Sequence, residues 1–222
     1  DDYHPERVIG LHIWNQLPSG FVGVNDSAVF ASADAFSLEV KGRGGHGALP
    51  HLNIDPIVAA SHIISNAQTI VSREISPQDP GVLTFGKIES GFAPNIIPDT
   101  VNIEGTIRAY SQEVREKIYS SLERISKLSA ESMRSTASTE IMYGAGPVVN
   151  EQEVASWVRD KAREVLDDSL VGPTEPVSVG DDMAEFLQRI PGVYFLLGAS
   201  VGNKYPHPVS YTHLTLPTIY SV

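Results

Sequence analysis

The residue of this sequence with the strongest chemical signature is His46, which lies in a glycine-rich stretch. The stretch reads GRGGHGALPH over residues 42–51, with four glycines around His46 and a second histidine, His51, behind Pro50. Glycine loses more conformational freedom than other residues when a loop becomes ordered, so such a loop is expected where the backbone must approach another group closely. This composition favours a functional role for His46 over that of an ordinary loop histidine, whereas His51 is more typical of a structural or solvated residue.

Three further residues could bind a ligand, and each also has a simpler interpretation. His12 lies near the end of the apolar stretch VIGLHIW, where it could bind a metal ion or be a buried histidine bonded to backbone. Asn95 lies between the prolines of APNIIPD and could bind a carbonyl or carboxylate group, or cap a turn. Arg108, in EGTIRAY, could hold a carboxylate through two hydrogen bonds or pair with Glu104. None of these residues decides a function by itself.

The elements that must position these residues follow from the hydrophobic pattern. Asp55 and Pro56 predict a helix start, and the helix is expected to bury a stripe and to end near Arg73. Ser111 is expected to cap a second helix, and Asn150 with Glu153 a third that ends near Leu166. The expected stripes are Ile57, Ala60, Ile64, Ala67 and Val71 in the first helix, and Val114, Ile118, Leu122, Ile125 and Leu128 in the second. Strands are expected at residues 8–14, 35–41, 81–89, 100–110, 138–143 and 193–197.

The order of these elements predicts the fold of the central part. Residues 35–148 run β-α-β-β-α-β, the order of a ferredoxin-like two-layer sandwich. The apolar strand at 193–197 does not alternate with polar residues, which indicates a sheet covered on both faces. The sequence therefore predicts a ferredoxin-like domain inserted between two segments of a larger α/β domain.

Composition limits the class of partner. The 222 residues carry 16 basic and 27 acidic side chains, a formal net charge of −11, which disfavours nucleic acid. No apolar run approaches the roughly 20 residues of a membrane span, so no membrane partner is expected. The sequence has no cysteine, which excludes disulfides and cysteine-ligated zinc, and the cytoplasm is the default compartment.

Taken in order, four motifs resemble one family. GLHIW, GRGGHGALPH…DP, PNIIPD…GTIRAY and VGDDMAEFLQRIPGVYFLLG resemble successive motifs of the metal-dependent amidohydrolase/exopeptidase family of hippurate hydrolase, N-acyl-amino-acid deacylases and indole-acetyl-amino-acid hydrolases. The resemblance implies an α/β fold in which a partial di-metal exopeptidase-like catalytic domain carries an inserted ferredoxin-like lid that also forms the dimer contact. We then expect catalytic-domain segments at 1–34 and 149–208, the lid and dimerisation domain at 35–148, and a tail at 209–222 that is a candidate artefact.

The same resemblance implies roles for single residues. His12 matches a metal-ligating histidine, and His207 lies near the position of the final metal ligand, although the family's H-x-P-x-F context is absent. His46 matches the lid histidine that polarises the scissile carbonyl group, often in the partner subunit. Asn95 and Arg108 match lid positions that bind the substrate's carbonyl or carboxylate group. The implied cofactors are two divalent ions, zinc or manganese, and the implied substrate is an N-acyl or N-aroyl amino acid.

Two of the family's motifs are not found in the chain. The first metal-binding motif and the Glu-Glu pair with the general base are expected before residue 1, so the sequence is interpreted as a C-terminal fragment of a homodimeric hydrolase. One alternative is a related dipeptidase or carbamoyl-amide hydrolase, with different ligand contacts around Asn95 and Arg108. Another is a non-catalytic dimerisation or binding module that uses the ferredoxin-like sheet.

Overall fold

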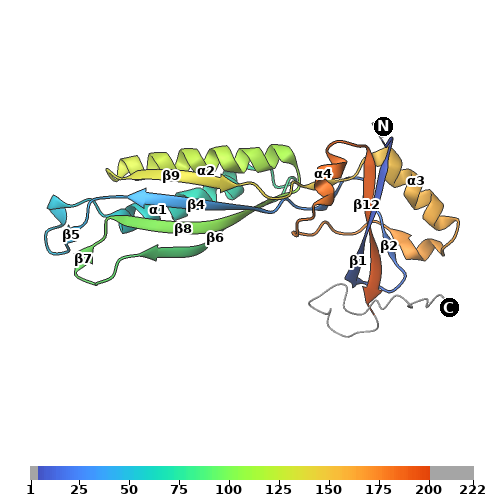
Figure 1. Cartoon of the computed structure of the whole chain (residues 1–222), viewed down its shortest axis with the longest axis horizontal. Coiled ribbons are helices and arrows are strands. Elements are labelled where there is room, and N and C mark those ends of the chain that lie inside the picture. Colours follow the sequence, from blue (N-terminus) through green and yellow to red (C-terminus); the bar gives the residue numbers. More distant parts are fainter. Residues whose placement is uncertain (1–4, 201–222) are drawn as a thin grey trace, which may run out of the picture. The chain divides into compact units, whose positions relative to one another are not determined.

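A computed structural model describes residues 5–200, which divide into two compact units (Figure 1). Residues 30–147 and 178–181 form the first, here called the lid unit, and the other described residues form the flanking unit. The segment 178–181 belongs to the lid unit because Ser178 Oγ lies 2.7 Å from the hydroxyl of Tyr110. None of the helices formed by residues 5–200 is long and apolar enough to cross a membrane.

The lid unit has the ferredoxin-like order that the sequence predicts. Its main strands are β4 (Asp34–Lys41), β6 (Gly81–Ser90), β8 (Thr100–Ala109) and β9 (Thr136–Met142), and its helices are α1 (Pro56–Thr69) and α2 (Gln112–Ser132). The sheet order is β6-β8-β4-β9 and every neighbouring pair is antiparallel. The predicted mixed α/β fold class is therefore confirmed.

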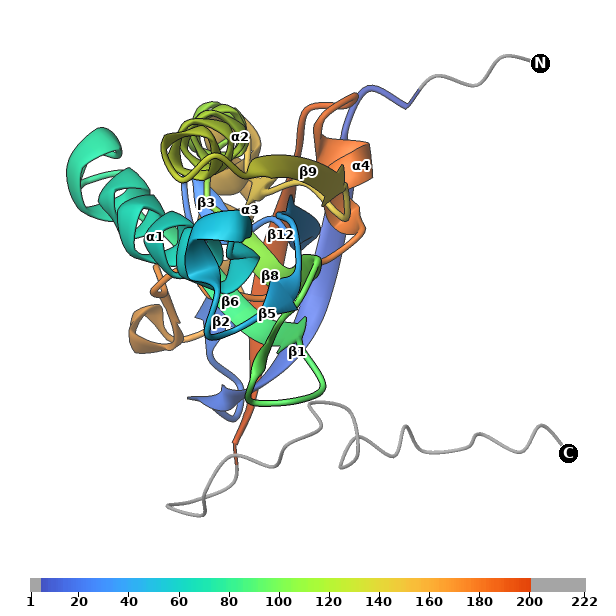
Figure 2. The same cartoon turned by 90° about the vertical axis from the view of Figure 1, so that its left-hand side faces the viewer.

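Both helices cover one face of this sheet, as the end view in Figure 2 shows. Alternate residues of β4, namely Phe36, Leu38 and Val40, are buried in one apolar core with side chains of α1 and α2. The opposite face carries polar and charged side chains, among them the ion pair of Lys87 with Glu104 at 3.0 Å. The sheet thus has one apolar and one polar face, as alternation along a strand requires.

The starts of α1 and α2 were predicted correctly, but both buried stripes need correction. Asp55 accepts hydrogen bonds from the backbone N–H groups of Ile57 and Val58, and Ser111 accepts one from Val114. In α1 and the π-turn η2 (Ile70–Glu74), the residues that face the core are Ala59, Ala60, Ile63, Ala67 and Ile70. Ile57 and Val71 are exposed instead, and in α2 the predicted Leu128 is 55% exposed. The first stripe is rotated by about one residue from the face that the helix buries.

The flanking unit contains a four-stranded sheet in the order β1-β12-β2-β11. These strands are β1 (Val8–Pro18), β12 (Gly192–Ser200), β2 (Val22–Gly23) and β11 (Val171–Gly172), and β1 runs parallel to β12. Helix α3 (Gln152–Arg163) packs Val154 and Val158 into the core of this unit. Strand β3 (Ala28–Phe30) begins in this unit, ends at the first residue of the lid unit and pairs with β10 (Val148–Val149). The flanking unit also contains the 3-10 turn η3 (Asp168–Leu170) and the short helix α4 (Met183–Leu187).

The predicted capping pair of α3 is wrong. Glu151 is the N-cap, and its carboxylate accepts hydrogen bonds from the backbone N–H groups of Glu153 and Val154. Asn150 is buried, and its amide bonds the backbone of Asn25 and both the N–H and the C=O of Tyr194. A buried amide must find partners, so the contact with β12 decides the role of Asn150.

Candidate functional site

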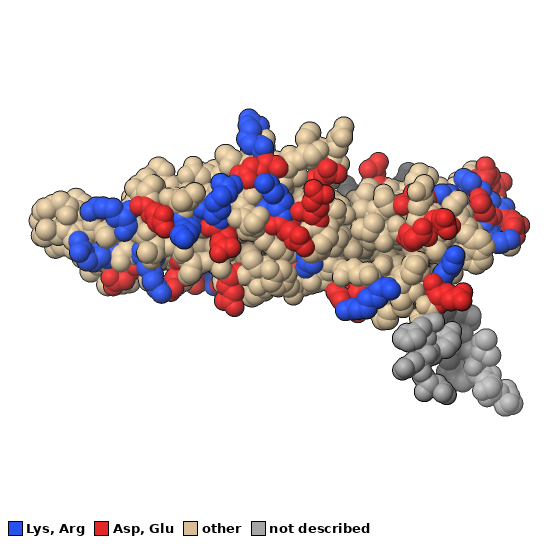
Figure 3. All heavy atoms as spheres, turned by 90° about the horizontal axis from the view of Figure 1, so that it is seen from above, with Lys and Arg blue, Asp and Glu red and all other residues tan. Residues whose placement is uncertain are grey.

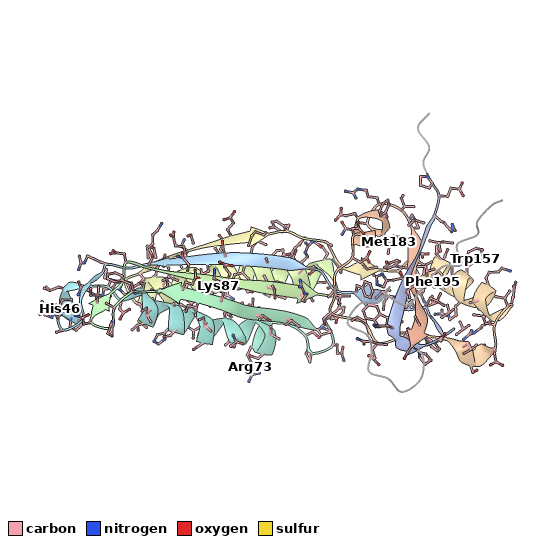
Figure 4. The ribbon with its side chains drawn as sticks, turned by 60° about the horizontal axis from the view of Figure 1, so that its bottom comes forward. His46, Arg73, Lys87, Trp157, Met183 and Phe195 are labelled. Carbon is pink, nitrogen blue, oxygen red and sulfur yellow. The ribbon has the colours of Figure 1, made fainter. Side chains whose placement is uncertain are left out.

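His46 and Asn95 lie together at one end of the lid unit, here called the tip. The two-residue strand β5 (Gly45–His46) pairs with β7 (Ile96–Ile97), so that His46 lies opposite Ile96. The backbone N–H of Gly47 also donates to the carbonyl oxygen of Asn95 at 2.8 Å. Figure 4 shows His46 at this end, beyond the ends of the long strands of the main sheet. The pairing fixes the histidine loop and the asparagine turn as one structure.

The glycines of the loop allow close backbone contacts, as the sequence predicts. A Cβ atom on Gly42 would lie 2.2 Å from the carbonyl oxygen of Ile54, and one on Gly44 would lie 2.7 Å from that of Ile97. Both distances are far below van der Waals contact, and both neighbours are backbone. Any other residue at these positions would force the loop away from α1 or from β7.

The imidazole of His46 is exposed and has a defined hydrogen-bonding pattern. The backbone N–H of Ala48 donates to its Nδ1 at 3.1 Å, so Nδ1 must carry a lone pair. In the neutral ring the proton is therefore on Nε2, which becomes a hydrogen-bond donor. Asn53, 7% exposed, supports the loop by donating to the carbonyl oxygens of His46 and Leu49 at 3.3 and 3.0 Å. Neither Ala48 nor Asn53 is marked by a sequence motif.

Asn95 occupies the exposed turn that precedes β7. Within residues 5–200 its side-chain amide makes no hydrogen bond, while its backbone carbonyl is held by Gly47. An amide with both a donor and an acceptor available, at the same tip as an imidazole donor, can bind a carbonyl or carboxylate group.

Arg108 lies at the opposite end of the sheet. It is eight positions along β8 from Thr100, the residue nearest the tip, which corresponds to about 26 Å of strand. Its Nη1 lies 3.5 Å from the carbonyl oxygen of Ser32, and it does not pair with Glu104, whose carboxylate binds Lys87. The structure of a single chain therefore brings His46 and Asn95 together and leaves Arg108 apart from them.

His12 lies on β1 in the flanking unit, among aromatic rings. Its Nδ1 is 3.1 Å from the hydroxyl oxygen of Tyr194, and the ring of Trp14 has its centroid 5.7 Å away. The backbone of Tyr194 is held by the buried amide of Asn150, which fixes the position of this residue on β12. A hydrogen bond at one ring nitrogen commonly orients a histidine that binds metal through the other.

The described residues do not form a metal centre on their own. Residues 5–200 contain no group of three or more His, Cys, Asp or Glu side chains placed to hold an ion. His207 lies outside the described residues. Among residues 5–200, the contacts of His12 suit a single metal ligand.

A buried ion pair lies at the other end of the lid unit, where the chain enters at Phe30 and leaves at Pro147; we call this end the root. Arg115 of α2 donates to Asp34 of β4 from Nε at 3.0 Å and from Nη2, and both side chains are at most 8% exposed. The N–H of Gly144 also donates to Asp34 at 3.0 Å, and the guanidinium donates to the carbonyl oxygen of Gly144. Burial alone raises the pKa of the Asp34 carboxyl group. Hydrogen bonds with Arg115, Tyr119 and the N–H of Gly144, together with the charge of Arg115, outweigh burial and hold that pKa below its usual 3.8.

Comparison with known proteins identifies the chain. Residues 32–133 match the family described as the peptidase dimerisation domain. The chain is 36% identical over 203 residues to N-acetyl-L-cysteine deacetylase of Bacillus subtilis. This match covers 91% of the chain and 48% of the relative. The chain belongs to the M20 family of peptidases and amidohydrolases.

Two other relatives are named for different reactions, one as a deacetylase and one as a carboxypeptidase. The chain is 36% identical to N-acetyldiaminopimelate deacetylase of Lactococcus lactis (87% of the chain, 52% of the relative). It is 37% identical to thermostable carboxypeptidase 2 of Saccharolobus solfataricus (90% and 50%). The chain thus spans about half the length of the curated relatives that it matches.

Solved structures agree with the family. A Staphylococcus aureus protein assigned as an aminohydrolase superposes with a TM-score of 0.86 at 31% identity, over 92% of this chain and 53% of that one. A dinuclear metal-binding peptidase of the M20 family from Bacillus subtilis superposes with a TM-score of 0.74 at 25% identity, over 91% and 51%.

Proposed function

We propose that this chain is part of a metal-dependent amidohydrolase of the M20 family that hydrolyses the amide bond of N-acyl or N-aroyl amino acids. The observation that carries the proposal is the tip, where backbone pairing brings the segment of His46, whose ring has its donor on Nε2, next to the segment of Asn95, whose amide has no partner in the described chain. Relatives named as deacetylases of N-acetyl amino acids support this choice of substrate. The cytoplasm remains our proposed compartment.

In the proposed reaction the tip binds and polarises the substrate. The Nε2–H group of His46 donates to the carbonyl oxygen of the scissile amide, and this bond strengthens as negative charge develops on that oxygen. Asn95 holds the amino acid's carboxylate or the carbonyl group through its side-chain amide. We propose that two divalent ions, zinc or manganese, would supply the activated water, and that His12 would be one of their ligands. Arg108 and His207 remain proposed substrate and metal residues.

The position of the tip supports a homodimer. The tip is the end of the lid unit opposite the root, where the chain enters and leaves, and about 26 Å of sheet separates the two ends. We therefore favour an arrangement in which His46 and Asn95 act on substrate bound by the partner subunit.

The surface of α1 suggests which side of the lid unit forms the dimer. Residues 56–72 contain no charged side chain, and the hydroxyl groups of Ser61 and Ser65 are bonded to carbonyl oxygens of their own helix. In contrast, the outer face of α2 carries mixed charges, as the view from above shows (Figure 3). An uncharged helix beside the unpaired edge of β6 is the better surface for a second copy.

The rotated stripe of α1 fits the same interpretation. Ile57, Ile64 and Val71 recur every seven residues, so they form one line along the helix, and two of them are exposed in the single chain. Gln68 lies one turn from Ile64 on that side. We propose that the part of this line from Ile64 to Val71 is buried by the partner subunit, which explains why its pattern resembles that of a core.

Light scattering tests the dimer surface. We expect a dimer for the wild-type chain and a shift toward monomer for Gln68→Lys, because a two-fold contact brings two equal charges together. Glu123→Lys on α2 is the matched control and should leave the dimer intact. A wild-type chain that stays monomeric at high concentration would refute the proposed surface.

Hydrolysis assays on the metal-loaded enzyme test the activity. N-acetyl and N-benzoyl amino acids should be cleaved faster than dipeptides or N-carbamoyl amino acids. Preferred cleavage of dipeptides would favour the alternative that the carboxypeptidase relatives support. No cleavage of any of these amides would favour a non-catalytic dimerisation module.

A further inference from the structure

The tip carries a group of exposed apolar side chains around His46 and Asn95. Six of the exposed large hydrophobic residues of the described chain lie in the histidine loop, the asparagine turn or the first turn of α1; they are Leu49, Leu52, Ile57, Val58, Phe92 and Ile96. Phe92 is the most exposed of them, at 84%. Apolar surface gathered at one place on a folded protein commonly marks a binding site.

Phe92 lines two hollows that also reach residues next to His46. One hollow, of about 530 Å³, has Phe92, Ile57, Ile96 and Pro98 in its walls, together with Gly47, the residue after His46. The other, of about 500 Å³, has Phe92 with Gly44 and Gly45, the residues before His46. Sites for small ligands typically have volumes in this range and are mostly apolar, with a few polar groups that orient the ligand.

The loop holds Phe92 in a fixed relation to Asn95. Gly91 has a φ of +69°, a conformation that glycine adopts easily, and the backbone N–H of Ile96 donates to the carbonyl oxygen of Ala93 at 3.2 Å. Phe92 and Asn95 therefore lie on one short turn, which β7 joins to His46. The ring of Phe92 can therefore contact the group that neighbours the scissile amide when His46 and Asn95 bind that amide.

We propose that Phe92 is a specificity-determining residue whose ring contacts the acyl group of the substrate, so that the enzyme prefers extended apolar or aromatic acyl groups over acetyl. This inference rests on the proposed function, because Phe92 lies beside the acyl group of the substrate only if His46 and Asn95 bind the scissile amide. The hollow beside Gly47 is the proposed place of the acyl group, since apolar side chains make up most of its lining.

The test compares Phe92→Ala with wild type on N-acetyl, N-hexanoyl and N-benzoyl derivatives of one amino acid. We expect kcat/KM to fall about 10-fold or more for the benzoyl and hexanoyl substrates and less than about 3-fold for the acetyl substrate, because the lost contact is apolar. Leu128→Ala, which removes an exposed apolar side chain from α2, is the matched control and should change none of the three. An equal loss for all three substrates, or no loss, would overturn the proposal.

A second measurement separates this proposal from the proposed function. If wild-type enzyme cleaves none of the three amides, the proposed function fails, but binding can still be followed by NMR. Shifts of the Phe92 ring protons on addition of N-benzoylglycine, absent with N-acetylglycine, would support the contact. The absence of such shifts would overturn it.

Discussion

Replacing Asp34 by asparagine should strongly destabilise the lid unit, because it leaves Arg115 buried without its counter-charge. The guanidinium is 8% exposed, and the Asp34 side chain is fully buried and accepts hydrogen bonds from Arg115 and from the N–H of Gly144. Removing one partner of such a pair typically costs about 3–5 kcal/mol, which is a large part of the ordinary 5–15 kcal/mol of a domain. With a denaturant slope of about 2 kcal/mol/M, the urea midpoint should fall by roughly 2 M.

Urea unfolding followed by circular dichroism measures this effect. Glu104→Gln is the matched control, since it removes a carboxylate that is 56% exposed and pairs with Lys87, and such pairs are worth about 0–1 kcal/mol. The reasoning is refuted if Asp34→Asn lowers the unfolding free energy by less than about 1 kcal/mol, or by no more than the control does.

Three further predictions follow from the same structure. The stabilisation from the Asp34 carboxylate should be complete above its ordinary pKa of 3.8 and should disappear as the pH falls through its lower folded pKa. Acid unfolding of wild type, followed by circular dichroism from pH 5 to pH 2, should therefore be steeper than that of Asp34→Asn. His46→Ala should lower turnover of an N-acyl amino acid by about 10²- to 10³-fold with metal content unchanged, whereas His12→Ala should lose metal and activity together; equal metal loss in both variants, measured by elemental analysis, would contradict these roles. Ala48→Pro removes the backbone N–H that donates to Nδ1 of His46, a hydrogen bond worth about 0.5–1.5 kcal/mol. The ratio of the tautomer with its proton on Nδ1 to the tautomer with its proton on Nε2 should therefore rise about 2- to 13-fold in ¹⁵N NMR spectra. Ala48→Gly keeps the N–H and should leave this ratio unchanged.

Local signals made much of the fold predictable from sequence. Asp55 and Ser111 were identified as helix caps because a cap bonds groups two or three residues away, and such contacts are visible in sequence. The glycines around His46 indicated a close approach of backbone, but the partners, Ile54 and Ile97, depend on the fold of the lid unit.

Tertiary contacts account for the predictions that failed or stayed open. The sequence predicts Asn150 as the N-cap of α3, yet its buried amide binds the backbone of Tyr194, which is distant in sequence, and Glu151 caps the helix instead. Asn95 and Arg108 are close in sequence, but β8 carries them to opposite ends of the sheet. Nothing in the sequence distinguishes the core stripe of α1 from the line that we assign to the dimer.

The root of the lid unit also bears on how such a unit can be inserted into another domain. The N–H of Ala33 donates to the carbonyl oxygen of Ala145 at 2.9 Å, and Arg115 ties Asp34 to Gly144, so the two ends of a long insertion meet as closely as the ends of a hairpin turn. A host sheet that receives such an insertion loses little more loop-closure entropy than it would for a tight turn, because the inserted unit closes its own ends. The main segment of the lid unit, residues 30–147, therefore begins and ends at nearly the same place, which is the geometry in which a domain insertion is tolerated without stretching the chain on either side.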